Sequence, residues 1–137
     1  MMRKEIQREY GLVAYEDDVL YSYINENVVL TPEIVEDINR IGFEYSEGRM
    51  HFSLADLRAN VTSTKEARAY AADNKYMANH IAYSILGNSL PVILVANFFI
   101  NIHKPKIMTR LFKTEKEALE WFEKIREKRR KNHNHSE

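Results

Sequence analysis

The stretch that decides the fold is residues 50–86, MHFSLADLRANVTSTKEARAYAADNKYMANHIAYSIL. Its first part, Met50–Asp56, alternates apolar and polar residues as a half-buried strand does. Its last part, His80–Leu86, is again rich in strand-forming residues, and the segment between them, about Thr64–Asp73, has a helical pattern. Strand, loop, helix and strand in this order predict a βαβ unit of an α/β sheet.

The residues before this unit predict a hairpin and a helix. Gly11–Tyr15 and Val19–Ile24 are β-rich runs joined by a short acidic connection, which is typical of an antiparallel hairpin. Thr31 and Pro32 then begin a helix, because a threonine can cap a free backbone N–H and a proline has none to leave unpaired. The helix runs to about Ser46, and its apolar face consists of Ile34, Val35, Ile38 and Ile41.

The residues after the unit predict a helix, a strand and a last helix. Leu90–Ile102 is too long for a typical strand and reads as a helix that ends near Pro105. Ile107–Phe112 reads as a strand, and a capping box at Thr114–Glu117 begins the last helix. The predicted fold class is therefore α/β, with a small mixed β-sheet, an N-terminal β-hairpin and alternating helices. We expect a single domain over residues 1–127 and a frayed basic and polar tail over residues 128–137.

Composition excludes several classes of function. The 20 basic and 20 acidic residues cancel, so the chain has no overall charge that would attract nucleic acid. There is no cysteine, which excludes disulfides, thiolate metal sites and cysteine nucleophiles. The N-terminus lacks the apolar core of a signal peptide, and the longest apolar run is too short to span a bilayer. We therefore expect a cytoplasmic protein.

Several segments resemble the STAS domain, the fold of the anti-sigma-factor antagonists, and more closely the small bacterial proteins described as SpoIIAA-like or STAS/SEC14-like. The resemblance covers roughly residues 10–126 and rests on Leu30–Glu33, Val61–Arg68, Ala96–Pro105, Arg110–Thr114 and Glu117–Trp121. It implies a STAS-like α/β fold and a regulatory module without catalytic activity. None of these segments is a catalytic fingerprint, so the resemblance bears on fold more than on function.

Two hydroxyl residues are candidate phosphoacceptors by this resemblance. STAS antagonists carry a phosphorylatable serine in an Asp-Ser-Ser-Gly-like turn at the start of their second helix. The comparable segment here is Thr62–Lys65, which offers Ser63 and Thr64 but lacks the preceding aspartate and the following glycine. A capping box between Ser63 and Glu66 would also explain a hydroxyl at this place, and it is the favoured interpretation.

The loop that leads into the second helix is a candidate binding site for a partner or an anion. It follows the end of a strand, where α/β sheets commonly place their ligands, and it contains Asp56, Arg58, Asn60 and Thr62. Arg58 could pair with a phosphate or remain a solvated surface arginine. Asp56 also raises the alternative of a response-regulator receiver, but Val19–Ile24 reads as a strand where that fold requires a helix.

The apolar residues of Leu90–Ile102 are too many for a helix with one buried face. The excess at Phe98, Phe99 and Ile102 predicts a second contact, either a homodimer interface or an apolar pocket. The leading hypothesis is a non-enzymatic regulatory or protein-interaction module. Such a module would bind a protein partner that the sequence does not identify, and it could be phosphorylated or form a homodimer. The alternative is a carrier of a small apolar or amphipathic ligand.

An enzyme is the third hypothesis, and it would require Asp56, His51 or His103 to converge in one cleft. No spacing of residues demands such a convergence, so no catalytic residue is assigned. No pair of histidines has the spacing of a metal site, and no cofactor, metal or nucleic-acid partner is predicted.

Overall fold

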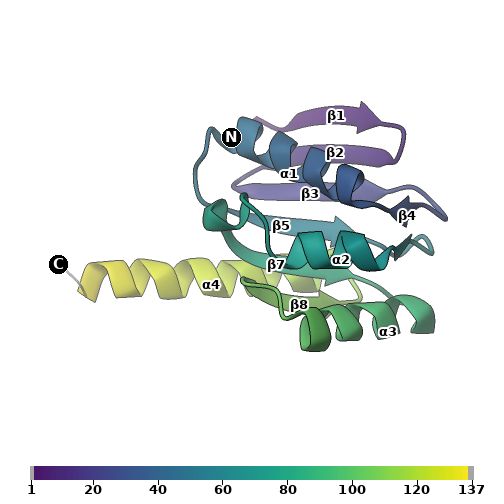
Figure 1. Cartoon of the computed structure of the whole chain (residues 1–137). Coiled ribbons are helices and arrows are strands. Elements are labelled where there is room, and N and C mark those ends of the chain that lie inside the picture. The colour runs from purple at the N-terminus through teal and green to yellow at the C-terminus, as the bar shows by residue number, and fades with distance from the viewer. Residues whose placement is uncertain (1, 136–137) are drawn as a thin grey trace.

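The predicted βαβ unit lies at the centre of the computed structural model, which describes residues 2–135 (Figure 1). It consists of β5 (His51–Asp56), α2 (Lys65–Ala72) and β7 (His80–Leu86). β5 and β7 pair in parallel, as a crossover connection through a helix allows.

The unit belongs to a mixed sheet of six strands in the order β1-β2-β3-β5-β7-β8. The antiparallel half is formed by β1 (Lys4–Arg8), β2 (Gly11–Glu16) and β3 (Val19–Ile24). From β3 onward the strands are parallel, and β8 (Met108–Phe112) closes the other edge. A second, two-stranded sheet pairs β4 (Val29–Leu30) with β6 (Thr62–Ser63). The predicted fold class is thus confirmed.

Helices cover both faces of the large sheet (Figure 1). α1 (Pro32–Ser46) lies with α2 on one face, and α4 (Glu115–His135) lies on the other. A 3₁₀ turn, η1 (Met77–Asn79), precedes β7. α3 (Leu90–Phe98) continues without a break into a π-helical turn, η2 (Phe99–His103), beside the β8 edge.

Local capping explains where α1 begins and ends. The Thr31 hydroxyl accepts a hydrogen bond from the Ile34 N–H at 3.3 Å, as the sequence predicts. At the other end, Glu47 takes a left-handed conformation with φ 56°, and its N–H bonds to the Glu44 carbonyl. The predicted apolar face of the helix packs on the sheet, where Ile38 and Ile41 are buried.

Three apolar clusters form the core. The first lies between α1 and the antiparallel half of the sheet, where Tyr15 and Leu20 are fully enclosed. The second lies under α4, where the Phe122 ring stacks on that of Phe52 with centroids 4.5 Å apart. The third joins α2, β7, α3 and η2. Its buried members are Ala72, Ile85, Ala96 and Phe99.

At both ends of the chain the structure has more secondary structure than the sequence predicts. The first strand, β1, was not expected because its residues are mostly charged or polar and only Ile6 is partly buried against the core. It is an edge strand that pairs only with β2, and charged side chains are common at sheet edges. At the other end, where the sequence predicts a frayed tail over residues 128–137, α4 continues to His135, and residues 136–137 lie outside the described residues.

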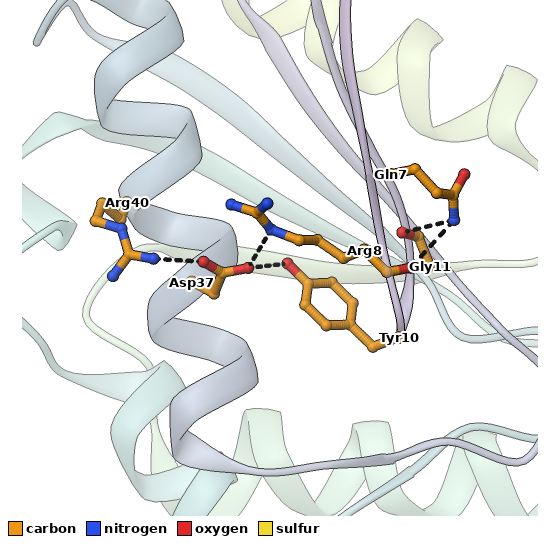
Figure 2. A network of polar contacts seen from close by, with 6 residues as sticks. All are labelled: Gln7, Arg8, Tyr10, Gly11, Asp37 and Arg40. Atoms are coloured by element: carbon orange, nitrogen blue, oxygen red, sulfur yellow. Dashed lines mark hydrogen bonds and ion pairs between the residues drawn. The ribbon is translucent and has the colours of Figure 1, made fainter.

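Asp37 of α1 ties the β1–β2 hairpin to the helix layer (Figure 2). Its carboxylate accepts hydrogen bonds from Arg8 Nε at 2.9 Å and from the Tyr10 hydroxyl at 2.7 Å, and Arg40 pairs with its second oxygen. Partial burial acts to raise the pKa of Asp37, but the bonds from Tyr10 and Arg8 outweigh it and lower the pKa. In the same view, Gln7 bonds to the carbonyl oxygens of Arg8 and Gly11 across the hairpin turn.

Replacing Asp37 by alanine is expected to destabilise the domain by about 1.5–3 kcal/mol, the usual loss when hydrogen bonds to a charged group disappear. Urea unfolding measures the loss. The matched control is Glu44→Ala, which removes an exposed carboxylate from the same helix and should change stability by less than about 0.5 kcal/mol. Equal effects of the two substitutions would contradict a specific role of the Asp37 network.

Candidate functional site

The candidate site is built around α3, the most apolar helix of the fold. Ser89 precedes it in an extended conformation and Pro91 occupies its first turn, which suits a helix start. Val92, Ala96 and Phe99 face inward and are buried against the third core cluster. The π-helical turn then ends at Lys104, which is left-handed with φ 50°. Short π-helical stretches are found frequently at functional sites.

The outward face of α3 and η2 is also apolar. Leu90, Leu94, Phe98 and Ile102 follow one another every four residues, and 67%, 59%, 47% and 62% of their surfaces are exposed. Residues four apart lie on the same side of a helix, so these four side chains form a continuous row. We call this row the α3 stripe. A contiguous apolar patch of this kind marks an interaction surface more often than an isolated exposed side chain does.

The stripe divides the three residues for which the sequence predicts a second contact. Phe98 and Ile102 belong to the stripe and are exposed, whereas Phe99 belongs to the core and is 5% exposed. Phe99 packs edge-on against Tyr83 of β7 with ring centroids 6.4 Å apart. The exposed apolar face therefore includes two of the three residues, together with Leu90 and Leu94.

Basic side chains border the C-terminal half of the stripe. The Arg68 guanidinium carbon lies 5.6 Å from the centre of the Phe98 ring, and Lys65 and Lys104 are nearby exposed cations. Within residues 2–135, no carboxylate forms an ion pair with any of these three cations. His103 lies edge-on to Phe98, and its pKa is lowered by desolvation and by the positive charges of Arg68 and Lys65. The border of the stripe therefore carries positive charge that nothing in the described chain neutralises.

Arg68 also lines a cavity between α2, α3 and the sheet, which we call the α2–α3 pocket. Its volume is about 50 Å³, and most of its wall is apolar. Its buried wall includes Val61, Ala67, Ala96 and Phe99, and its polar lining consists of Thr62, Ser63, Arg68 and Tyr83. The pocket thus lies beside the stripe, on the inner side of α3.

The two candidate phosphoacceptors have different roles. Thr64 is the helix cap, because its hydroxyl accepts the Ala67 N–H at 3.0 Å, so the predicted capping box at Ser63 is wrong. Ser63 is instead part of β6, where it pairs with Leu30. Arg68 Nη1 donates to the Ser63 carbonyl at 2.8 Å and to its hydroxyl at 3.0 Å. Only Ser63 therefore places a hydroxyl beside an unneutralised cation.

The four residues of the predicted binding loop have separate surroundings, and only Asp56 and Arg58 bond to each other. Arg58 binds Asp56 through Nε at 2.9 Å and Nη2 at 2.8 Å, and this hydrogen bonding raises the pKa of Arg58. Asn60 is left-handed and donates to the Asn27 side chain at 2.8 Å. Thr62 alone of the four reaches the α2–α3 pocket. The structure therefore does not bring Asp56, Arg58 and Asn60 together with Ser63.

The structure adds residues that sequence reasoning did not single out. Arg68 is not among the residues that the sequence predicts for a site. It lies four residues after the cap, where it faces back toward Ser63. Leu90 and Leu94 are not among the residues for which the sequence predicts a second contact, although their four-residue spacing to Phe98 is visible in the sequence. Tyr83 gave no signal of its own, because its pocket exists only once α2 and α3 are packed.

The candidate residues of an enzyme do not converge. Asp56 and His51 lie at opposite ends of β5, and His103 lies at the end of η2. His51 faces His80 instead, with ring centroids 4.8 Å apart. In the described part of the chain, no group of three or more histidine, aspartate or glutamate side chains is placed to hold a metal ion.

Comparison with known proteins supports the fold and assigns no activity. A family model described as "Domain of unknown function (DUF7793)" matches residues 13–126. No curated protein matches the chain. A crystal structure of an uncharacterised protein of the DUF3478 family from Shewanella loihica PV-4, described as having a SpoIIAA-like fold, is 11% identical. The match covers 88% of this chain and 91% of that one with a TM-score of 0.51, so it shows the fold.

The helices give no sign of a membrane span. Among residues 2–135, none has both the length and the apolar character that crossing a bilayer requires.

Proposed function

Because the chain belongs to the family of domains of unknown function DUF7793, we propose a function from its site: a non-enzymatic module that binds a segment of a partner protein. The binding surface is the α3 stripe, and the segment is acidic and apolar. The observation that carries the proposal is the exposure of Leu90, Leu94, Phe98 and Ile102 in one continuous row.

Burial of the stripe would supply the binding energy. Covering a large apolar side chain that is fully exposed is worth about 1.5–3 kcal/mol, and each member of the stripe has roughly half or more of its surface in water. Apolar contact alone would also favour unspecific association. Selective binding of one partner therefore needs a further feature of the surface.

Charge supplies that feature. Lys65, Arg68 and Lys104 lie beside the C-terminal half of the stripe without a neutralising carboxylate in the described chain. The net charge of the whole chain is zero, so this positive border is local. Acidic residues beside the apolar anchors of a partner would be attracted to it, and such complementarity improves specificity and association rate.

The fold is compatible with this role. A SpoIIAA-like fold suggests a STAS-like domain, a class of regulatory modules to which several segments of the sequence are similar. The separation of Asp56, His51 and His103 favours binding over catalysis.

A selection of displayed random peptides would test the proposed surface. The wild-type domain is expected to enrich peptides that carry several large apolar residues and net negative charge. The double variant Leu94→Glu/Phe98→Glu should weaken binding of those peptides about tenfold or more, because it places negative charge on a surface from which the bound peptide would exclude water. The matched control is Met50→Glu, an exposed apolar residue on the α4 side of the sheet, which should bind as the wild type does.

Other occupants of the stripe would give different results. A homodimer that the double variant dissociates, measured by light scattering, would assign the stripe to a second copy of the chain. Binding to vesicles of anionic lipid without enrichment of any peptide would assign it to a membrane surface. Either result would overturn the proposal.

Phosphorylation of Ser63 is the regulatory input that this surface could receive. A phosphate on Ser63 would meet the Arg68 guanidinium, which already bonds to the serine hydroxyl at 3.0 Å. It would neutralise part of the positive border, so Ser63→Asp should weaken the selected acidic peptides and Ser63→Ala should not. Equal affinity of the two variants would remove Ser63 from the proposal.

A further inference from the structure

The α2–α3 pocket combines an apolar interior with a cation, and we propose that it binds a small amphipathic anion. The ligand would be a carboxylate on a short apolar chain, with the chain in the pocket and the carboxylate on Arg68. This site is distinct from the α3 stripe, because Leu94 and Phe98 do not line the pocket.

The interior of the pocket suits an apolar chain better than water. A volume of about 50 Å³ has room for roughly three to five water-sized groups. Water in such a space needs two to four polar partners per molecule, and Val61, Ala67, Ala96 and Phe99 offer none. Methylene groups need no hydrogen bonds and would fill the same space favourably.

Water has a better place in a neighbouring cavity. This inner cavity of about 30 Å³ shares Leu30, Val35, Leu57 and Tyr83 with the pocket. Its wall contains three buried polar side chains, namely Ser22, Asn39 and Ser53. Ordered water there would satisfy these groups, so the outer pocket is the compartment that an apolar chain would occupy.

Arg68 has the hydrogen-bonding capacity that a carboxylate requires. Its Nη1 is used by Ser63, whereas its Nε is buried and has no partner among the described residues. A buried donor of a charged group without an acceptor is costly, and a carboxylate binds a guanidinium through two parallel hydrogen bonds. An anionic head at this place would therefore satisfy the buried Nε and neutralise the charge.

The surrounding positive charge determines which sign of charge a ligand can carry. Lys65 is a second, exposed cation three residues before Arg68 on α2, and Phe98 covers the guanidinium from the side of α3. A cationic amphiphile would be repelled there, and an uncharged alcohol would offer Arg68 only a neutral acceptor, which forms a weaker hydrogen bond and leaves the positive charge in place.

Hexanoate is the probe for this site, because its five chain carbons match the space in the pocket; its binding is followed by amide chemical shifts of the full chain and compared with that of 1-hexanol. Saturable binding is expected to shift α2, α3 and β7, with hexanoate about tenfold or more tighter than hexanol, because a hydrogen bond between two charged groups is stronger than one to a neutral hydroxyl. Arg68→Gln should abolish this preference, and Ala71→Leu, which fills the pocket, should abolish binding of both compounds.

Other outcomes would overturn the proposal. These are equal affinity for hexanoate and hexanol, undiminished binding to Ala71→Leu, or no saturable binding at all. Leu94→Glu separates this site from the proposed protein-binding surface. It should weaken peptide binding and leave hexanoate binding unchanged, whereas Ala71→Leu should do the reverse.

Discussion

Replacing Phe122 by alanine is expected to destabilise the domain by about 3–5 kcal/mol, the range for removing a large buried aromatic side chain. Phe122 is 0% exposed and stacks on Phe52 with ring centroids 4.5 Å apart. It is the largest apolar side chain that α4 inserts fully into the second core cluster. Its loss would leave a cavity between helix and sheet. The free energy of unfolding in urea, compared with that of the wild type, measures the effect.

The matched control for this variant is Phe43→Ala. Phe43 is an aromatic residue of α1 with 44% of its surface exposed, so its truncation should cost much less. A loss of less than about 1 kcal/mol for Phe122→Ala would mean that α4 contributes little to the cooperative unit. Since α4 and α3 cover different faces, any Phe122→Ala protein that remains folded should still bind the selected peptides.

Acidification is expected to destabilise the domain through the buried pair His51 and His80. Burial, together with the neighbouring His51, lowers the pKa of His80 from 6.5 to about 4. Burial also lowers the pKa of His51, against the effect of its bond to the Arg49 carbonyl. Each Nδ1 is 2.9 Å from a backbone carbonyl and therefore carries the proton, so a second proton would have to enter at Nε2. The Nε2 of His51 is buried and has no hydrogen-bond partner within residues 2–135.

The sign of the effect follows from these pKa values. Between pH 6.5 and about 4 the unfolded chain binds more protons at position 80 than the folded one, so stability falls as pH falls. The contribution is complete above pH 6.5, and its loss by about pH 4 amounts to roughly 3 kcal/mol at 1.36 kcal/mol per pH unit.

Unfolding in urea across this pH range would measure the loss. The variant His80→Asn keeps a donor for the Tyr76 carbonyl and cannot be protonated, so its stability should depend less steeply on pH than that of the wild type. Carboxylates such as Asp37 titrate in both proteins, and their contribution cancels in the comparison. If the free energies of unfolding of the two proteins changed with pH by the same amount, a role of His80 would be contradicted.

Local sequence patterns were sufficient to predict an element where its local preference and its tertiary contacts agree. The start of α1 at Thr31 and the bounds of β7 were predicted because the cap and the strand composition remain the same in the folded state. β1 escaped prediction because its pairing with β2 does not require apolar residues, and its contacts with α1 through Ile6 and Arg8 form only in the folded chain. The cap of α2 was misplaced by one residue because β4 recruits Ser63 into a strand.

The candidate site was less predictable than the fold. The excess of apolar residues in α3 was visible, but adjacent Phe98 and Phe99 have opposite environments that depend on how the helix is rotated against β7 and α2. The role of Arg68 depends on two elements that meet only in the folded chain, because its partners are Ser63 of β6 and Phe98 of α3.

The four-residue spacing of the α3 stripe also constrains how a helical partner could lie on it. Side chains at this spacing form a ridge inclined by roughly 26° to the helix axis, and two such ridges interlock when the helices cross at about −50°. A partner helix would therefore cross α3 obliquely instead of running alongside it. The contact would be confined to a few turns around Leu94 and Phe98, so a short segment of a partner would be enough to cover it.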